Sequence, residues 1–241
     1  MQHCGGDHSV VMAAKVSTDP DVAAGVKKHK KDSFGLINYL MKHRHGTPFE
    51  HAFLTFYVHA PIFVWREWHR HRVQSYNEES ARYKILNPVF YIPPPERPMF
   101  KVPDWKPGRP KFMTMHECLY PDGSVLYMED YKKPAYQQLV KNLKEVYALA
   151  YKKYKENLAL DVDPGLARDC LPVGIYSSCW VSMNPRSLMA FLSLRTHDPE
   201  STFVSYPLYE IEVAARQVEK VLKKYFPLTH KAFVENGRVG P

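Results

Sequence analysis

The strongest constraint on this chain is a junction between an apolar run and a polar block. The run AFLTFYVHAPIFVW, residues 52–65, is hydrophobic enough that a folded protein buries it. The block RHRVQSYNEESARY, residues 70–83, follows almost at once and places serine, asparagine and tyrosine between both signs of charge. A surface charge run with local ion pairs is the ordinary interpretation, but it does not explain these interleaved polar groups. We therefore expect the block to bind an anionic, hydrogen-bonding ligand such as a nucleotide.

The size and charge of the chain favour a globular protein with anionic partners. Of its 241 residues, 45% are hydrophobic and 13% aromatic, which allows a sizeable core. Lysine and arginine number 33 against 25 acidic residues, and this net charge of +8 favours phosphorylated metabolites, nucleic acid or an anionic surface. No apolar run has the length of a membrane span, the first residues lack a signal-peptide pattern, and the four cysteines lack CxxC spacing. We therefore expect a cytoplasmic protein with no membrane partner.

Hydrophobic periodicity and capping signals predict both helices and strands. In chain order we expect a helix capped by Asp32 or Ser33 and stopped at Gly46, a strand at 52–58, a short helix from Pro61 through Trp68, a short strand at 90–93, a helix over 136–154, a short helix from Asp163 to Arg168, a strand at 173–183, a helix from Asn184-Pro185 to Arg195, and a helix over 208–222. We expect the apolar stripe of the 136–154 helix to belong to the core. The basic run KKHKK, residues 27–31, is expected to be a solvated surface.

No internal repeat and no shift of composition divides the chain. One α+β domain over residues 1–241 is therefore the economical interpretation. Prolines gather between Pro88 and Pro134, and we interpret residues 93–134, approximately, as an extended excursion from the core. Within it, the step Pro121-Asp122-Gly123 is typical of a hairpin turn.

Histidines and cysteines suggest two other kinds of site. His43, His45 and His51 are near His69 and His71 in sequence, but no HExxH motif is present, and the neighbouring arginines would repel a divalent cation. We therefore expect no metal site, and His45 is better suited to donate a hydrogen bond to a ring or a phosphate.

A nucleophilic cysteine is the second alternative. Cys170 lies between Arg168 and Pro172, where positive charge would favour a thiolate. The commoner fate of a lone cysteine is to be a small buried hydrophobic residue, and we expect that here.

Arginines are the strongest candidates to hold an anion. Several lie at the ends of expected elements or in polar motifs: Arg70, Arg72, Arg82, Arg168, Arg186 and Arg195. Glu78, Ser80 and Arg82 are spaced by two, so an extended backbone would point them the same way as a cradle for phosphate and sugar. Arg186 and Arg195 lie on one helix about 13–14 Å apart along its axis and on roughly opposite faces. We expect them to serve two sites, or two ends of one large ligand.

Nucleic acid is the alternative partner. The chain shows no helix-turn-helix, zinc-finger or RNA-recognition signature, and no GxGxxG or P-loop. Acidic residues inside the polar block also argue against a surface that simply binds along a nucleic-acid backbone. We therefore expect no nucleic-acid partner and keep this class as the rival hypothesis.

The polar block closely resembles the signature of the flavin-dependent thymidylate synthases, Arg-His-Arg followed after seven residues by Ser. Here Arg70-His71-Arg72 is followed by Ser80, and Asn77-Glu78 and Arg82-Tyr83 extend the match. Further matching segments occur in the same order along most of the chain: AAKVS (13–17), HGTPFEH (45–51), APIFVWREW (60–68), FYIP (90–93), Arg168 with Leu171-Pro172, and NPRSLMAFLSLR (184–195). The resemblance is weakest between about Pro93 and Pro134.

This resemblance implies a fold and a reaction. The fold would be a central twisted, mainly antiparallel sheet flanked by helices, assembled as a homotetramer whose active sites are shared between subunits. The reaction would transfer a methylene carbon from 5,10-methylenetetrahydrofolate to C5 of dUMP. NADPH would reduce FAD, the reduced flavin would supply the hydride, and dTMP and tetrahydrofolate would leave. No cysteine nucleophile is required.

The resemblance also implies which residues form the site. The family's flavin contacts fall on Ser17, His45, Thr47, Arg70, His71, Arg72, Glu78, Asn184 and Arg186. Its dUMP contacts fall on Glu67, Arg70, Glu78, Ser80, Arg82, Arg168 and Arg195, and Arg195 is expected to be catalytic by favouring ionisation at N3 of the uracil. Two positions depart from the family pattern. Glu67 stands where Gln is common, and Ala190 stands where a polar side chain often contacts the flavin, so that contact is expected to be lost.

Overall fold

The computed structural model describes residues 1–26, 32–102, 112–120, 124–129 and 131–241. They form two compact units. The first contains Met1–Val58, Arg66–Glu78 and Ser178–Pro241, and the second contains His59–Trp65 and Glu79–Ser177. The basic run 27–31 and the turn at 121–123 lie outside the described residues, so the expectations for them stay predictions.

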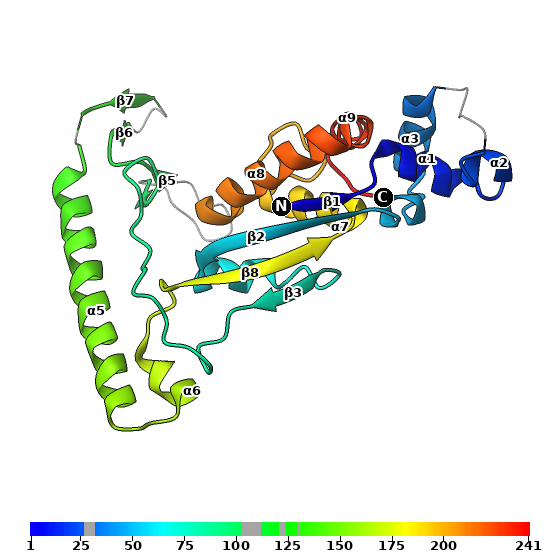
Figure 1. Ribbon diagram of the computed structural model, residues 1–241. Helices are drawn as coiled ribbons and strands as arrows, with labels where there is room; N and C mark the ends of the chain where they lie inside the picture. Colours follow the sequence, from blue (N-terminus) through cyan, green and yellow to red (C-terminus); the bar gives the residue numbers. More distant parts are fainter. Residues whose placement is uncertain (27–31, 103–111, 121–123, 130) are drawn as a thin grey trace. The chain divides into compact units, whose positions relative to one another are not determined.

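A four-stranded sheet with the order β1-β2-β8-β3 forms the framework of the first unit (Figure 1). Its strands are β1 (Gln2–Cys4), β2 (Phe53–Pro61), β8 (Tyr176–Met183) and β3 (Ser75–Glu78). β1 is antiparallel to β2 and β3 is antiparallel to β8, and Figure 1 shows β2 and β8 running in opposite directions. The expected antiparallel sheet is therefore confirmed. Helix α4 (Ile62–Trp68) continues directly from β2, as Pro61 indicates.

Burial alternates along the two central strands, so that one face of the sheet belongs to the core. Leu54 and Phe56 on β2 and Val181 on β8 are buried, as the two-residue period of a strand requires. Helices α7 (Pro185–Arg195) and α8 (Tyr209–Tyr225) lie along the sheet and complete this core with their own buried faces (Figure 1). Both helices were expected, and their buried faces explain why apolar residues recur at helical spacing in the sequence.

The opposite side of the same strands carries exposed aromatic residues. Phe53, Tyr57 and Trp180 are 52%, 58% and 42% exposed, and the rings of Tyr57 and Trp180 lie 5.3 Å apart. These three aromatic side chains therefore lie on the face of the sheet opposite the core.

Short helices surround one end of the sheet: α1 (Asp7–Lys15), α2 (Pro20–Ala23), α3 (Ser33–Lys42), the 3₁₀ helix η1 (Thr47–Glu50) and α9 (Pro227–Glu235). Asp32 caps α3, because its carboxylate accepts hydrogen bonds from the backbone N–H groups of Phe34 at 2.9 Å and Gly35 at 3.0 Å. The expected stop at Gly46 is wrong. The helix ends at Lys42, because Arg44 takes a left-handed conformation with φ of 60°.

A buried ion-pair network fixes the segment that follows α9. Arg238 is only 6% exposed, and its guanidinium donates to Glu219 Oε1 at 2.7 Å and to Thr196 Oγ1 at 2.9 Å. His230 Nε2 lies 3.1 Å from the same oxygen of Glu219. Burial alone would raise the pKa of Glu219, but the hydrogen bonds from His230 and Arg238 outweigh it and lower the pKa to about 2.

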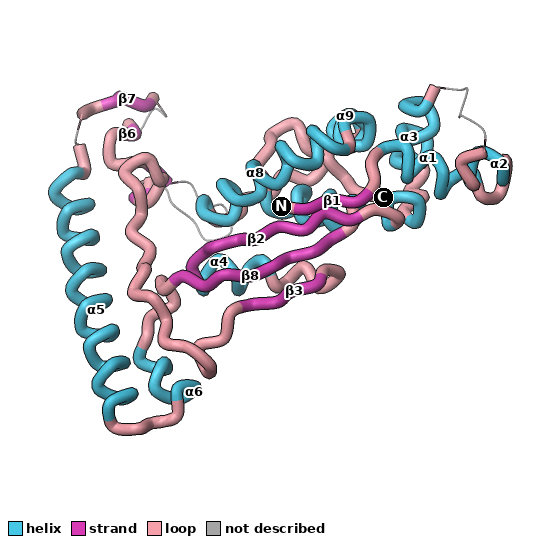
Figure 2. Tube along the Cα trace, viewed as in Figure 1, coloured by secondary structure: helices cyan, strands magenta, loops and turns pink. Residues whose placement is uncertain are grey.

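The second unit contains the long helix α5 (Lys133–Ala159), the short α6 (Pro164–Ala167) and the 3₁₀ helix η2 (Arg168–Cys170). Its proline-rich excursion includes two small sheets, β4 (Phe100–Lys101) with β5 (Phe112–Met113) and β6 (Glu117–Leu119) with β7 (Val125–Tyr127). Figure 2 shows that the described chain between β3 and α5 is otherwise mostly loop. The expected 90–93 strand is reduced to a single bridge between Phe90 and Ile175.

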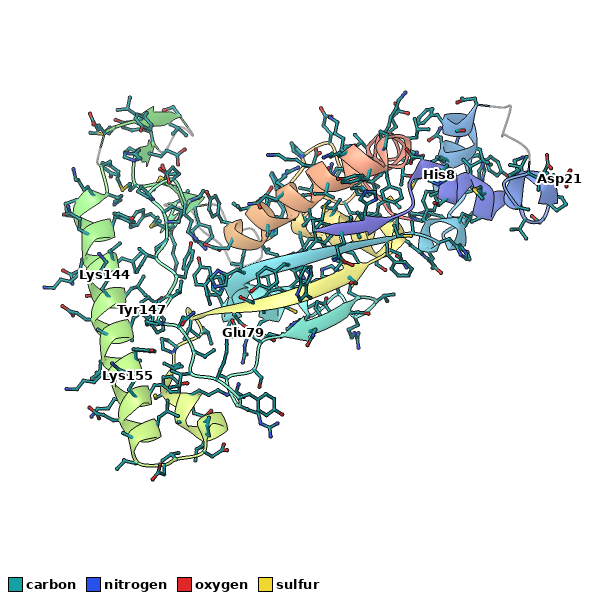
Figure 3. The ribbon with its side chains drawn as sticks, in the orientation of Figure 1. His8, Asp21, Glu79, Lys144, Tyr147 and Lys155 are labelled. Carbon is teal, nitrogen blue, oxygen red and sulfur yellow. The ribbon has the colours of Figure 1, made fainter. Side chains whose placement is uncertain are left out.

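The expectation that the stripe of α5 belongs to the core is wrong for most of its residues. Within the described part of α5 only Tyr154 is buried, and Val146 is 55% exposed. The tyrosines instead hold the extended segment where the excursion begins. The hydroxyls of Tyr136 and Tyr147 donate to the carbonyls of Pro93 and Tyr91, each at 3.0 Å, and Figure 3 shows Tyr147 pointing from α5 toward this segment.

Candidate functional site

A hollow of about 460 Å³ lies in the first unit between the end of α1, the connection from α3 to η1, and the start of α7. Its lining includes Ser17, Arg44, His45, Gly46, Thr47 and Arg186. Four of these residues, Ser17, His45, Thr47 and Arg186, are among the expected flavin contacts. The fold brings them together from three separate segments of the chain.

Arg186 lies flat against Gly46. A Cβ atom at position 46 would lie 2.5 Å from Cζ and Nε of Arg186, so a side chain there would displace the guanidinium, whereas the backbone, with a φ of −76°, would accept one. Arg186 Nε donates to the carbonyl of Pro241 at 2.9 Å and Nη1 donates to Glu50 Oε1 at 2.5 Å. The guanidinium is therefore oriented by Gly46, Glu50 and Pro241.

Asn184, another expected flavin contact, caps α7. Its side-chain oxygen accepts a hydrogen bond from the N–H of Ser187 at 2.8 Å, which fixes the helix start that presents Arg186. Asn184 is not among the residues that line the hollow.

Arg195, at the other end of α7, belongs to a different cluster. Its Nη1 donates to Glu67 Oε2 at 3.2 Å, its Nη2 donates to the Glu67 carbonyl at 3.2 Å, and its Nε donates to His71 Nε2 at 3.1 Å. Arg186 and Arg195 therefore have separate partners, as their opposite positions on the helix predicted. Glu67, His71 and Arg195 are brought together.

His71 is held as a neutral imidazole in this cluster. Burial and then the charge of Arg195 lower its pKa to about 4. Because its Nε2 accepts from Arg195, the proton of the neutral ring belongs on Nδ1. The ring also lies edge-on to Phe191, with centroids 4.9 Å apart, so α7 both supplies Arg195 and packs against His71.

Arg70, Arg72 and Glu78 lie outside the hollow. Both arginines are exposed in the connection between α4 and β3, and Glu78 is the exposed last residue of β3. Glu78 pairs across the sheet with Cys179, and burial and the nearby Glu78 charge raise the pKa of that buried thiol.

Ser80, Arg82 and Arg168 form a third group, in the second unit. The expected alternation from Glu78 to Arg82 is wrong, because the chain turns after Ser80 with a hydrogen bond from Tyr83 N to its carbonyl at 3.1 Å. Both arginines instead lie at Gly165. Arg168 Nε donates to its carbonyl at 3.3 Å, and a Cβ there would lie 3.5 Å from Cγ of Arg82.

The expectation of a buried Cys170 is wrong, because its side chain is exposed and the buried cysteine is Cys179. Among the described residues, no group of three or more histidine, cysteine, aspartate and glutamate side chains is arranged to hold a metal ion. In the same part of the chain, no helix has both the length and the apolar character needed to cross a membrane.

Arg44 and Glu50 are the site residues that the sequence did not reveal. Arg44 directly precedes the matched segment HGTPFEH and Glu50 lies inside it, but their relevance comes from Arg186 and Gly240, which are distant in sequence. A basic residue next to a matched segment was the available signal for Arg44.

Three comparisons relate this geometry to known proteins. A family model described as "Thymidylate synthase complementing protein" matches residues 1–228. The flavin-dependent thymidylate synthase of Tropheryma whipplei (strain TW08/27) is 42% identical over 241 residues, covering 100% of this chain and 93% of the relative. That of Streptomyces coelicolor is 44% identical over 238 residues, covering 98% and 89%. The crystal structure of the UMP/dUMP methylase PolB from Streptomyces cacaoi bound with 5-Br UMP superimposes with a TM-score of 0.84 at 39% identity, covering 100% of this chain and 94% of that one.

Proposed function

This chain belongs to the flavin-dependent thymidylate synthase family and is a methyltransferase, and from that premise we propose that it converts dUMP to dTMP in de novo dTMP biosynthesis. In this proposal 5,10-methylenetetrahydrofolate donates the carbon, and FAD reduced by NADPH supplies the hydride. The observation that carries the proposal is the convergence of Ser17, His45, Thr47 and Arg186 on one hollow.

The residues of this hollow fit the phosphate-bearing part of FAD. The Arg186 guanidinium and the hydroxyls of Ser17 and Thr47 are donors of the kind that phosphate and ribityl oxygens accept. The cavity of about 460 Å³ is within the usual range of small-molecule sites. We assign the remaining flavin contacts to residues of the same unit that do not line the hollow: Arg70, His71, Arg72, Glu78 and Asn184.

Two other groups of residues would bind dUMP. Ser80, Arg82 and Arg168 offer one hydroxyl and two guanidinium groups, which suit a phosphate. Arg195 would be the catalytic residue, because a permanent cation stabilises negative charge that develops on the pyrimidine ring. Glu67 and His71 hold that guanidinium in one orientation.

We also propose that residues 1–241 act as one domain in a cytoplasmic homotetramer whose subunits share active sites. The support on this chain is the exposure of the aromatic side chains of Phe53, Tyr57 and Trp180, since aromatic residues are enriched at protein interfaces. Folate binding would follow from the same assembly. Sedimentation equilibrium tests it, and a protein that stays monomeric at micromolar concentration would contradict it.

The activity is tested with purified protein in two steps. We expect a flavin absorption spectrum that changes when dUMP is added, and release of tritium from 5-tritiated dUMP that requires both NADPH and methylenetetrahydrofolate. A colourless protein that cannot be reconstituted with FAD would overturn the proposal.

Two further measurements test the alternative ligands. UMP is assayed beside dUMP, because the Streptomyces cacaoi neighbour is a UMP/dUMP methylase, and equal turnover of UMP would contradict the assignment to dTMP synthesis. Oligonucleotide binding that falls steeply with salt and that dUMP does not compete would favour the nucleic-acid rival.

A further inference from the structure

The backbone at Arg44 is unusual for an arginine. Its φ of 60° lies in the left-handed region that favours glycine, at the point where α3 ends. The N–H of His45 returns to the carbonyl of Leu40 at 2.9 Å and that of Arg44 to Met41 at 3.2 Å, so this is a helix C-terminus where glycine is the common residue.

The guanidinium of Arg44 converges with that of Arg186. Both side chains line the same hollow, Arg44 Nη1 donates to the carbonyl of Gly240, and Arg186 Nε donates to the carbonyl of the next residue, Pro241, at 2.9 Å. Two guanidinium groups bonded to consecutive carbonyls lie close to one another.

The two guanidinium groups differ in their side-chain partners. Arg186 has an ion pair with Glu50, whereas within the described ranges of the chain no aspartate or glutamate side chain lies at ion-pair distance from Arg44. The hollow therefore contains two guanidinium groups, together with the hydroxyls of Ser17 and Thr47. Such a set of donors binds a phosphate with charge-assisted hydrogen bonds.

We propose that Arg44 is a second phosphate-binding residue of the flavin site, acting with Arg186 on the diphosphate of FAD. The carbonyls of Gly240 and Pro241 hold both guanidinium groups in position, and the diphosphate takes their remaining N–H donors. This inference rests on the proposed function, since it deepens the assignment of the same hollow to FAD.

The test compares flavins that differ in phosphate. Dissociation constants of FAD and riboflavin are measured by flavin fluorescence for the flavin-free full chain and for Arg44→Gly, Arg44→Lys and the control Lys42→Ala. Arg44→Gly removes the guanidinium while glycine keeps the left-handed backbone without strain. Lys42→Ala removes the same charge from an exposed position two residues away that does not line the hollow.

We expect Arg44→Gly to weaken FAD binding by about 10- to 100-fold, the usual effect of one charge-assisted hydrogen-bond donor. Riboflavin binding is expected to be unchanged in the same variant, because riboflavin has no phosphate. Arg44→Lys should recover part of the FAD affinity, and Lys42→Ala should match the wild type.

Three outcomes would overturn the inference. Wild-type FAD affinity in Arg44→Gly would show that the guanidinium makes no contact with the cofactor. An equal loss for FAD and riboflavin would show that Arg44 only shapes the hollow. A wild-type chain that binds no FAD at all would refute the proposed function and this inference with it, whereas the first two outcomes leave the proposed function intact.

Discussion

Arg195 donates a hydrogen bond from Nη1 to Glu67 Oε2 at 3.2 Å, and the two side chains are 17% and 30% exposed. The family resemblance pointed to Gln as the common residue at position 67, so the carboxylate here adds an ion pair to the hydrogen bond. An ion pair of intermediate burial contributes about 1 kcal/mol to the free energy of unfolding.

Replacing Arg195 should abolish turnover without releasing the flavin. In Arg195→Ala we expect tritium release from dUMP to fall by about 100-fold or more, while the flavin absorbance of the purified protein is retained. In a double-mutant cycle with Glu67→Ala, chemical denaturation should give a coupling energy of about 1 kcal/mol.

The neighbouring exposed Arg66 gives the control, because consecutive helix residues do not face each other, and Arg66→Ala with Glu67→Ala should be additive. Loss of the flavin in Arg195→Ala would mean that the two ends of α7 have been assigned to the wrong ligands.

His71 should titrate far below an ordinary histidine. In an NMR titration we expect a pKa of about 4. Arg195→Met should raise this pKa but leave it below 6.5, because burial is the larger cause. Since the unfolded chain binds this proton near pH 6.5 and the folded chain does not, folding stability contributed by the neutral ring is lost as pH falls from 6.5 to 4. A His71 pKa at or above 6.5 would contradict the hydrogen bond from Arg195.

Cys170 should be dispensable for turnover. Although its side chain is exposed, the proposed reaction needs no thiol nucleophile, so Cys170→Ala is expected to retain tritium release within about twofold of the wild type. A thymidylate synthase that depends on a cysteine would instead lose all activity in this variant, and Cys4→Ala provides the control for removal of another exposed thiol.

Local signals in the sequence predicted the helix starts but not the contacts between distant residues. Asp32 caps the helix that it was expected to cap, and Asn184 caps the helix that was expected to start there, because a cap involves a side chain and a backbone N–H within three residues. The Glu67–Arg195 pair spans 128 residues, and no local pattern contains that information.

The helical period of α5 was also visible in the sequence, but it led to a wrong prediction of which residues are buried. Periodicity shows which residues share a face, but it does not show what covers that face. Tyr136 and Tyr147 hold an extended segment through hydrogen bonds from their hydroxyls. Counting tyrosine as a hydrophobic residue hides this role. In the candidate site, the resemblance identified the members of the hollow, but only the fold shows that Arg44 joins them.

An alanine at position 46 should displace the side chain of Arg186 without straining the backbone of residue 46. Gly46 has an ordinary φ of −76°, and the alanine Cβ would lie 2.5 Å from the guanidinium. We therefore expect Gly46→Ala to weaken FAD binding by about tenfold, as measured by flavin fluorescence. Gly35→Ala is the matched control, since the nearest atom there is a side-chain oxygen of Asp32 at 3.1 Å, and neither Gly35 nor Asp32 lines the hollow. Unchanged FAD affinity in Gly46→Ala would show that the position of Arg186 is not required.

The Glu219 network should make the protein sensitive to acid in a defined window. The pKa of Glu219 is lowered from 4.5 to about 2 in the folded chain, so its stabilising contribution is present above pH 4.5 and is lost as pH falls from 4.5 to 2. Glu219→Gln keeps the shape but removes the charge that Arg238 and His230 contact, and we expect the free energy of unfolding at pH 7 to fall by about 2 kcal/mol. Denaturant titrations from pH 7 to pH 2 should also show a shallower loss of stability in this variant. Glu235→Gln is the control, because the Glu235 carboxylate is 49% exposed and lies 3.8 Å from Lys231. The free energy of unfolding of this variant should differ from that of the wild type by less than about 1 kcal/mol. An equal effect of the two substitutions would show that the buried network contributes no more than a surface ion pair.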